Sequence, residues 1–276
     1  RPDLADPERV GKSLAAALIQ AAGQLGLSSV HATFCDAFSQ VAFEAAGYLP
    51  RHGVQYHWHN QGYGSFDDFL GALSSRKRKA IRKERRDAHS CGLTYVTRRG
   101  ADITAEDWKA FYRFYLSTID RKWGSAYLTE AFFPMLSERL GDSVVLMLAE
   151  NDGKAVAGAL NLMGTDALFG RNWGCEGDWP FLHFELCYYQ AIEFAIRHGL
   201  SRVEAGAQGE HKIQRGYLPV RTNSAHAILD PGLKRAIANF LDLERSEVAD
   251  EVSGVMEFSR SEEHTLNSSH VALSRM

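Results

Sequence analysis

The sequence predicts a mixed α/β fold in which one sheet domain follows part of another. Three observations lead to this expectation. Strand-like runs alternate with amphipathic helical segments along most of the chain, the pair Asp152-Gly153 suits a hairpin turn, and a short strand-like run at 202–204 leads into a glycine-rich polar stretch. Helices, an antiparallel meander and a further helix–strand unit together describe a mixed sheet covered by helices.

The first part of the chain contains two helices that alternate with two strands. In the helix expected at 7–25, apolar residues recur near helical spacing from Val10 to Ile19, and Gly26 follows where a helix would stop. A strand, a helix and another strand follow at 29–35, 38–46 and 54–58. This order completes a unit whose beginning is absent, so we expect the natural protein to start upstream.

A second unit begins near Ser65 and contains the larger sheet. We expect helices at 66–88, 105–119, 130–140, 184–197 and 231–248, and strands at 93–96, 143–149, 155–163, 167–173, 202–204 and 224–229. Gly92 and Gly199 stand where the helices before them would end. The composition changes abruptly after Glu257, so we expect 258–276 to be a non-native or disordered tail.

Composition and charge narrow the class of protein. The 276 residues are 45% hydrophobic and 24% charged, and the net charge of -3 does not indicate DNA as a partner. No apolar run approaches the roughly 20 residues needed to span a bilayer. The four cysteines form no CxxC pair, which favours reduced thiols in a cytoplasmic protein.

Signals for a metal site or for familiar catalytic motifs are absent. His57 and His59 alternate on one strand face, which suits two metal ligands, but no third ligand is evident, so we expect no metal. No serine nucleophile elbow, Walker loop, HExxH or dinucleotide fingerprint occurs.

The most informative stretch runs from Glu204 to Tyr217 and reads EAGAQGEHKIQRGY. Its chemistry-bearing side chains are Gln208, Glu210, His211, Lys212 and Arg215. A strand end that turns through glycines into a short polar helix can direct backbone NH groups, a carboxylate and cations at one ligand. The alternative is a solvated loop held by local ion pairs, such as Glu210 with Arg215 or Lys212.

We expect this stretch to carry the catalytic residues. Ionised Glu210 or neutral His211 can accept a proton from an attacking amine, which makes these two the catalytic candidates. The candidates for substrate binding in the same stretch are Gln208, Lys212, Arg215 and Tyr217. The two cations among them are suited to holding an anion.

A second cluster lies at 169–189. Arg171 and Trp173 end a strand, a glycine-rich loop follows, and His183 and Glu185 enter a helix. These four residues are further candidates for substrate binding. A core or capping role for His183 is the alternative, and we expect Tyr188 and Tyr189 to belong to the core or its rim.

A third cluster is the helix at 76–86, RKRKAIRKERR, with eight basic residues and one glutamate. Cations this dense repel one another, so an anionic partner would offset the cost. The candidates for anion binding are Arg76, Lys79, Arg82 and Lys83. A phosphate backbone, a pyrophosphate lipid headgroup and a nucleotide all fit, and the alternative is a solvated helix face.

Three strings resemble the FemAB-like branch of the GNAT-like superfamily, whose members are called peptidoglycan biosynthesis/recognition proteins or GNAT family N-acetyltransferases. They are GRNWGC at 170–175, LHFELCYYQ at 182–190 and GAQGEHKIQRGYLP at 206–219. The resemblance covers roughly 14–248. It implies tandem GNAT-like domains: the C-terminal part of a first domain at 1–64 and a complete second domain at 65–250.

The resemblance also implies an acyltransferase. Fem-type relatives transfer an aminoacyl group from tRNA to the amine of a peptidoglycan precursor, and plain GNAT enzymes use acetyl-CoA. The loop at 174–185 does not match the (R/Q)xxGx(G/A) pyrophosphate loop, and the chain lacks the long charged helical hairpin of some Fem enzymes. Both acetyl-CoA and aminoacyl-tRNA therefore stay open as the donor. The expected acceptor is a small molecule or a cell-wall precursor. If the precursor is membrane-bound, we expect the protein to contact it peripherally.

Two functions from different classes are consistent with these residues. In an acyltransferase, Glu210 or His211 would be the base, and Arg171, His183 and Glu185 would line the wall opposite Lys212 and Arg215. In a non-catalytic recognition protein, the same cleft would bind a glycopeptide or an anionic ligand.

Overall fold

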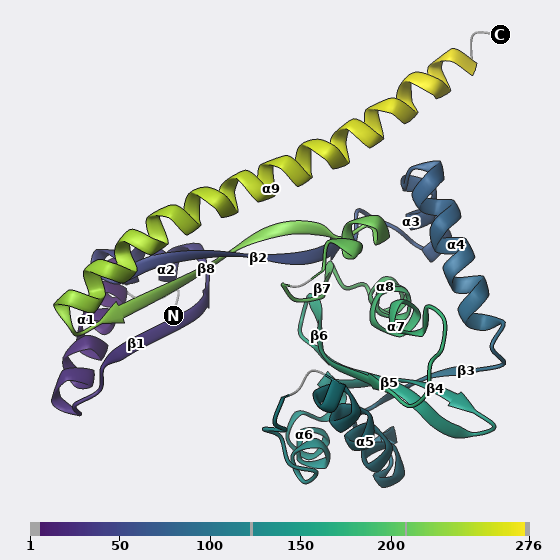
Figure 1. Ribbon diagram of the computed structural model, residues 1–276, viewed down its shortest axis with the longest axis horizontal. Coiled ribbons are helices and arrows are strands. Elements are labelled where there is room, and N and C mark those ends of the chain that lie inside the picture. Colours follow the sequence, from purple (N-terminus) through teal and green to yellow (C-terminus); the bar gives the residue numbers. More distant parts are fainter. Residues whose placement is uncertain (1–5, 122–123, 208, 274–276) are drawn as a thin grey trace. The chain divides into compact units, whose positions relative to one another are not determined.

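The computed structural model describes residues 6–121, 124–207 and 209–273, and within these no side chain at 210, 251 and 255–273 (Figure 1). The chain forms two compact units. Unit 1 contains the chain up to Gln55 together with Pro219–Ser261, and unit 2 contains Tyr56–Leu218. The domain boundary expected near residue 64 stays a prediction.

Unit 1 is a small antiparallel sheet with helices. Its elements are α1 (Pro7–Gln24), β1 (Ser29–Cys35), α2 (Ala37–Ala45), most of β2 (Leu49–His59), most of β8 (Leu218–Ile228) and the beginning of α9 (Pro231–Leu273). The strand order is β1-β8-β2. Ala15, Tyr48, Ala225 and Ala227 form the core, and the Tyr48 hydroxyl donates to the Ala15 carbonyl at 3.1 Å.

Unit 2 contains the larger sheet, in the strand order β2-β7-β6-β5-β4-β3. Its strands are the end of β2, β3 (Thr94–Arg99), β4 (Val144–Asn151), β5 (Lys154–Met163), β6 (Ala167–Cys175) and β7 (Arg202–Glu204). Strands β3 to β6 form an antiparallel meander, whereas β6 and β7 are parallel. A mixed sheet is therefore confirmed for this unit.

Helices cover both faces of this sheet. Figure 1 shows α5 (Ala105–Arg121) and α6 (Phe132–Leu140) on one side of β4 to β6, and α7 (Leu182–Phe184) and α8 (Gln190–Arg197) on the other. Because successive side chains of a strand point to opposite faces, β4 is buried on both: Val144 to Ala149 are all at most 1% exposed. A strand between two helical layers reads as a continuous apolar run.

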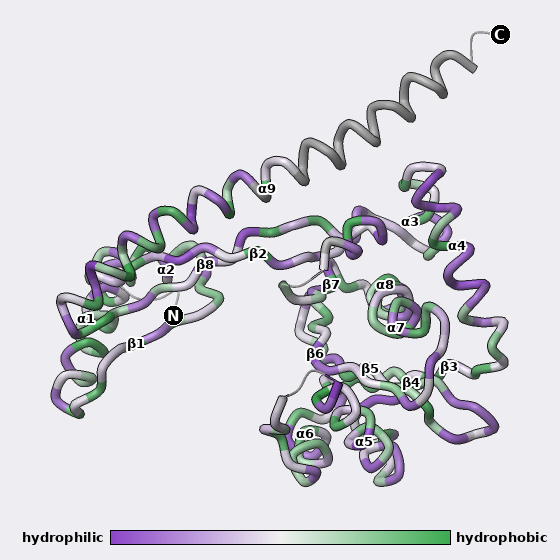
Figure 2. Tube along the Cα trace, viewed as in Figure 1, coloured by the Kyte–Doolittle hydropathy of each residue, from purple (hydrophilic) through white to green (hydrophobic). Residues whose placement is uncertain are grey.

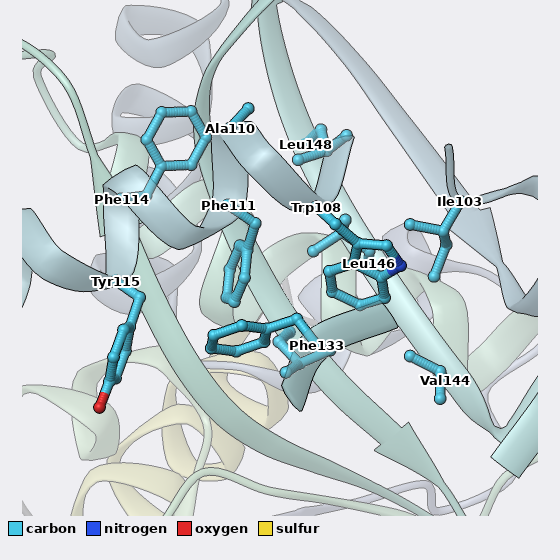
Figure 3. Close-up of a cluster of buried hydrophobic side chains, with 11 residues drawn as sticks. Ile103, Trp108, Ala110, Phe111, Phe114, Tyr115, Phe133, Val144, Leu146 and Leu148 are labelled. Atoms are coloured by element: carbon cyan, nitrogen blue, oxygen red, sulfur yellow. The ribbon is translucent and has the colours of Figure 1, made fainter. Parts of the chain in front are cut away.

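The core under α5 and α6 is largely aromatic. Phe111, Trp108 and Phe133 face one another above β4 (Figure 3), with the Phe111 and Phe133 ring centroids 5.4 Å apart and nearly perpendicular. Such pairs add stabilisation beyond burial of their area. This layer makes the sheet a rigid support for the opposite face.

Helix α5 approaches β6 so closely that position 174 admits no side chain. A Cβ added to Gly174 would lie 2.1 Å from the Phe114 carbonyl oxygen. The Thr118 and Ser117 hydroxyls donate to the carbonyls of Trp173 and Cys175, at 2.9 and 3.3 Å. The last turns of α5 therefore fix the end of β6.

The prediction of one continuous helix at 66–88 is wrong. It is interrupted between α3 (Phe66–Ala72) and α4 (Ser75–His89). Leu73 is extended, with ψ 158°, and the Ser74 side chain accepts the Lys77 backbone N–H at 3.3 Å. A serine that caps a helix N-terminus supplies a local reason for the break.

The helix expected at 184–197 is also not regular. It consists of α7, a π-helical turn η3 (Glu185–Tyr189) and α8. At the other end of the chain, α9 continues to Leu273 and so includes most of the segment 258–276. That this segment is a non-native or disordered tail stays a prediction. None of the helices in the described ranges combines the length and apolar character that crossing a membrane requires.

Candidate active site

The candidate site lies in unit 2, where the pairing of β6 with β7 ends. The parallel register runs from Ala167 opposite Arg202 to Phe169 opposite Glu204, whereas β6 continues to Cys175. Backbone groups on a strand edge beyond its partner are available to a ligand. A cavity of about 130 Å³ opens here.

The cavity is lined by β5, β6, the helical segment after β6, and Ala205 just beyond β7. Its polar lining consists of Asn161, Arg171, Asn172, His183 and Tyr188. Three residues expected to bind substrate, Arg171, Trp173 and His183, are thus brought together, with the Trp173 and His183 ring centroids 5.1 Å apart. No carboxylate among the described side chains pairs with Arg171.

Strained backbone leads into the helical wall of the cavity. Phe181, just before α7, has φ 58°, a left-handed conformation that bulky residues rarely adopt. The π-helical turn η3 follows and carries Cys187 and Tyr188 to the cavity. Strained positions and π-turns both occur preferentially at functional sites.

Glu185, a residue expected to line the substrate wall, lies inside the protein. Its side chain is fully buried and accepts from Arg85 at 2.9 and 3.1 Å and from Gln190 at 2.7 Å. His89 Nε2 lies 3.0 Å from the same carboxylate. Glu185 therefore anchors the π-turn to α4 and does not face a ligand.

Tyr188, which lines the cavity, is hydrogen-bonded to His211. The Tyr188 hydroxyl lies 2.9 Å from Nε2 of His211. Burial raises the pKa of Tyr188, so the phenol stays protonated. Partial burial, with Arg215 and Lys212 nearby, lowers the pKa of His211 below 6.5, so the imidazole is neutral at pH 7. A neutral imidazole bonded to a phenol can accept its proton.

His211 belongs to a short 3₁₀ helix, η4 (Glu210–Arg215), which follows Gly209. Gly209 has φ 103°, and a Cβ there would lie 2.2 Å from Cε1 of His211. Only glycine adopts this backbone readily, and only glycine leaves room for the ring. A side chain at position 209 would therefore displace the imidazole.

The two cations of η4 bind the protein itself. Arg215 donates to both carboxylate oxygens of Glu84, at 2.7 and 3.1 Å, and its guanidinium carbon lies 3.4 Å from the centroid of the Phe184 ring. Lys212 Nζ donates to the carbonyls of Ala205 and Gly206, at 2.6 and 3.1 Å. Both side chains are almost fully buried, so they secure η4 to its neighbours.

Burial also governs the remaining titratable groups of the site. It lowers the pKa of Lys212 to about 8, and it raises the pKa of the Cys187 thiol, which therefore stays protonated and is a poor nucleophile. Tyr217 is fully buried and packs edge-on against Tyr188, with ring centroids 5.4 Å apart. Tyr217 supports the site from behind and does not line the cavity.

Two expected site residues fall outside what the structure describes. Gln208 is not among the described residues, and of Glu210 only the backbone is described. The proposed base Glu210 and the substrate contact Gln208 therefore stay predictions.

Comparisons with known proteins identify the family and the fold. The model of the FemAB-like family, described as peptidoglycan biosynthesis/recognition, matches residues 3–260. The chain belongs to this family. No curated protein matches this chain.

Solved structures share the fold of this FemAB-like protein. The C-terminal domain of a putative lysylphosphatidylglycerol synthetase from Agrobacterium fabrum has a TM-score of 0.62 at 12% identity, covering 84% of this chain and 76% of that one. L-PGS from Bacillus licheniformis has a TM-score of 0.58 at 11% identity, covering 81% and 76%. FemX has a TM-score of 0.57 at 12% identity, covering 82% and 79%. The mixed α/β fold class is thereby confirmed.

The basic helix α4 has an outer and an inner side. It is the most hydrophilic helix of unit 2 in Figure 2. The four residues expected to bind anions, Arg76, Lys79, Arg82 and Lys83, are all exposed. Arg82 has a weak partner in Asp67, at 3.5 Å. Inner residues Lys77, Glu84 and Arg85 are buried or half-buried.

The strand pair β2–β7 contains His57 and His59, the two histidines whose spacing suits metal ligands. Nε2 of His57 lies 3.7 Å from Oε2 of Glu204, and His59 is paired with Arg202 across the strands. In the part of the chain that is described, no three His, Cys, Asp or Glu side chains are arranged to hold a metal ion.

Sequence reasoning misses Tyr188 and Glu84 as residues of the site. Tyr188 lies in an apolar helical run typical of the core, and the π-turn that directs it to the cavity has no spacing signal. Glu84 is hidden as the single acid of a basic run. A lone carboxylate in a basic run is the one sequence signal for this role, since such a carboxylate can pair with an arginine from a distant part of the chain.

Proposed function

We propose that this FemAB-like protein is an N-acyltransferase that moves an aminoacyl or acetyl group to an amine of a peptidoglycan precursor. One observation carries the proposal: Tyr188 lines the cavity at the end of the β6–β7 pairing, and its hydroxyl is hydrogen-bonded to His211. Amide formation needs a proton acceptor for the amine and a proton donor for the leaving group, and this pair can serve as both.

The reaction can be written with protons balanced. The amine nitrogen bonds to the acyl carbon, and the bond from that carbon to the donor oxygen or sulfur breaks. The amine proton passes to the Tyr188 oxygen while the Tyr188 proton passes to Nε2 of His211. The leaving oxygen or sulfur takes a proton back along the same path, so His211 ends neutral. Backbone NH groups on the free edge of β6 would stabilise the oxyanion.

Acetyl-CoA and aminoacyl-tRNA both carry phosphates, and cations are available for them. Arg171 faces the cavity without a carboxylate partner among the described side chains. On α4, the exposed Arg76, Lys79, Arg82 and Lys83 would bind a phosphate backbone or the headgroup of a membrane-bound precursor. Arg171 takes the anion-binding role that the sequence suggests for Lys212 and Arg215, because the partners of those two cations are protein groups.

A second candidate is a non-catalytic recognition protein. Two buried ion pairs favour it, Arg215 with Glu84 and Glu185 with Arg85, since polar residues expected at the ligand instead stabilise the fold. In this case the cavity would bind a glycopeptide or an anionic ligand without turnover.

The experiment supplies acetyl-CoA and aminoacyl-tRNA in parallel, with a muropeptide amine as acceptor, to the full chain. The variants are Tyr188→Phe and His211→Ala. Tyr95→Phe is the matched control, because its hydroxyl also makes one hydrogen bond, to the Ala88 carbonyl at 3.1 Å, away from the cavity.

Transfer by the parent and the control, reduced about 10²-fold or more in both site variants, would support the proposal and name the donor. Full activity of Tyr188→Phe would contradict the proposed proton path through Tyr188. Muropeptide binding by every variant with no transfer from either donor would favour the recognition protein.

A further inference from the structure

A second hollow, of about 300 Å³, adjoins the cavity and shares two of its residues. Trp173 and His183 line both spaces, so their rings form the partition between them. The other lining residues are Thr118 and Arg121, at the end of α5. Two spaces on either side of one wall suit a reaction that joins two substrates.

Arg121 is oriented by backbone carbonyls. Its Nη2 donates to the Cys175 carbonyl at 3.0 Å, and its Nε donates to the Ser117 carbonyl at 3.2 Å. Nη2 also donates to the Ser117 hydroxyl at 3.1 Å. These neutral acceptors fix the guanidinium without neutralising its charge, and a guanidinium held in place loses little freedom when it binds an anion.

No carboxylate in the described ranges pairs with Arg121. Arg113, two turns earlier on the same helix, is different: it donates to Glu176 at 3.0 Å. Both arginines are exposed, so the contrast reflects their partners rather than their burial. Arg121 therefore carries an uncompensated positive charge at the edge of the hollow.

We propose that this hollow is the acceptor subsite and that Arg121 binds a carboxylate carried by the amine substrate. The inference rests on the proposed function and adds a substrate class: amino acids or peptides are preferred over neutral amines. Among the described residues that line the hollow, Arg121 is the single permanently charged one, which matches the one charge of a carboxylate better than a doubly charged phosphate.

The position of the hollow gives Arg121 a role in placing the amine. A substrate anchored by its carboxylate at Arg121 extends past the Trp173–His183 partition toward the cavity, where Tyr188 lies. Thr118 stabilises this wall, because its hydroxyl donates to the Trp173 carbonyl at 2.9 Å. Arg121 is thus a specificity-determining residue, and the proton transfer stays with Tyr188 and His211.

The test compares alanyl-alanine with its C-terminal amide, which has the same amine and no carboxylate. Binding to the full chain is measured by calorimetry without any acyl donor, so the result does not depend on turnover. The variants are Arg121→Gln, Arg121→Lys, which keeps the charge, and Arg113→Gln as the matched control. Thermal unfolding verifies that each variant is folded.

We expect the dipeptide to bind about tenfold or more tightly than the amide. Arg121→Gln should abolish this preference, Arg121→Lys should retain part of it, and Arg113→Gln should leave it unchanged. Equal binding of the two peptides, or binding of neither, overturns the inference. Displacement of the dipeptide by inorganic phosphate at a lower concentration than by acetate also overturns it.

Turnover separates this inference from the proposed function. If the protein transfers acyl groups, Arg121→Gln should raise KM for the dipeptide and leave KM for its amide unchanged. If no amine is acylated but the carboxylate preference persists and depends on Arg121, the proposed function fails and the subsite stands.

Discussion

Glu84 and Arg215 form a bidentate ion pair between α4 and η4, with side chains only 16% and 7% exposed. The next residue of α4, Arg85, holds Glu185 of the π-turn. Tyr189 also donates to Glu84. One helix therefore fastens both segments that carry the reactive pair, Tyr188 on the π-turn and His211 on η4. The inner side of the basic helix is a support for the site.

Replacing Glu84 should destabilise the fold. Glu84→Gln leaves Arg215 charged and almost buried, and breaking a buried pair from one side costs about 3 kcal/mol. Urea unfolding measures the loss. Glu106→Gln, which removes an exposed partner of Lys109, should cost less than about 1 kcal/mol. Similar losses in the two variants would contradict a structural role for the Glu84–Arg215 pair.

Acyl transfer should depend on pH through His211. The imidazole accepts a proton only when neutral, and partial burial with Arg215 and Lys212 nearby lowers its pKa below 6.5. The acid limb that His211 contributes to the rate should therefore have a midpoint below 6.5. The measurement is kcat/KM from about pH 5 to about pH 8. An unchanged acid limb in His211→Ala would exclude His211 as the acceptor.

Gly209 should be required for activity more than for folding. A Cβ at this position would meet the His211 ring at 2.2 Å, so Gly209→Ala should displace the ring from Tyr188 and reduce kcat about 10²-fold. Gly199→Ala is the matched control, since Gly199 also has a positive φ, 65°, with no atom within 4 Å of the added carbon. Equal kcat in the two variants would show that catalysis does not depend on the position of the His211 ring.

Lys212 should make stability rise with pH in the alkaline range. Its pKa is lowered from 10.5 to about 8, so between these values the unfolded chain holds a proton that the folded chain has released. Stability therefore increases with pH across that window. Relative to Lys212→Met, the parent should gain about 2 kcal/mol between about pH 8 and about pH 10. Urea unfolding at several pH values measures this, and a constant difference would show that Lys212 keeps its ordinary pKa.

Local signals predict most of the fold. The strand expected at 29–35 is β1, and the expected hairpin joins β4 to β5 through Asp152 and Gly153, both with positive φ. Apolar periodicity and turn residues are local properties, so single segments reveal them. The break at Ser74 and the π-turn escape prediction because both leave the apolar spacing intact while changing the backbone at one or two residues.

The candidate site is predicted less completely. The sequence places Arg171, Trp173, His183 and His211 in two separate polar stretches, and the structure brings both stretches to one cavity region. The sequence does not indicate which residues pair with these side chains. Local spacing suggests Glu210 for Arg215, whereas the observed partner is Glu84, 131 positions away. Pairing across such separations depends on topology, which no short pattern encodes.

The π-turn at Glu185–Tyr189 has a consequence for changes in chain length. A π-turn is an α-helix with one residue inserted, and each residue of an α-helix turns the next by about 100°. Deleting one residue from this turn would restore a regular helix and rotate Tyr188 away from the cavity if Glu185 kept its place on Arg85. Substitutions on the outer face of this segment leave its length unchanged. A deletion or an insertion changes which side chains face the cavity, so the number of residues in the turn is itself a requirement of the site.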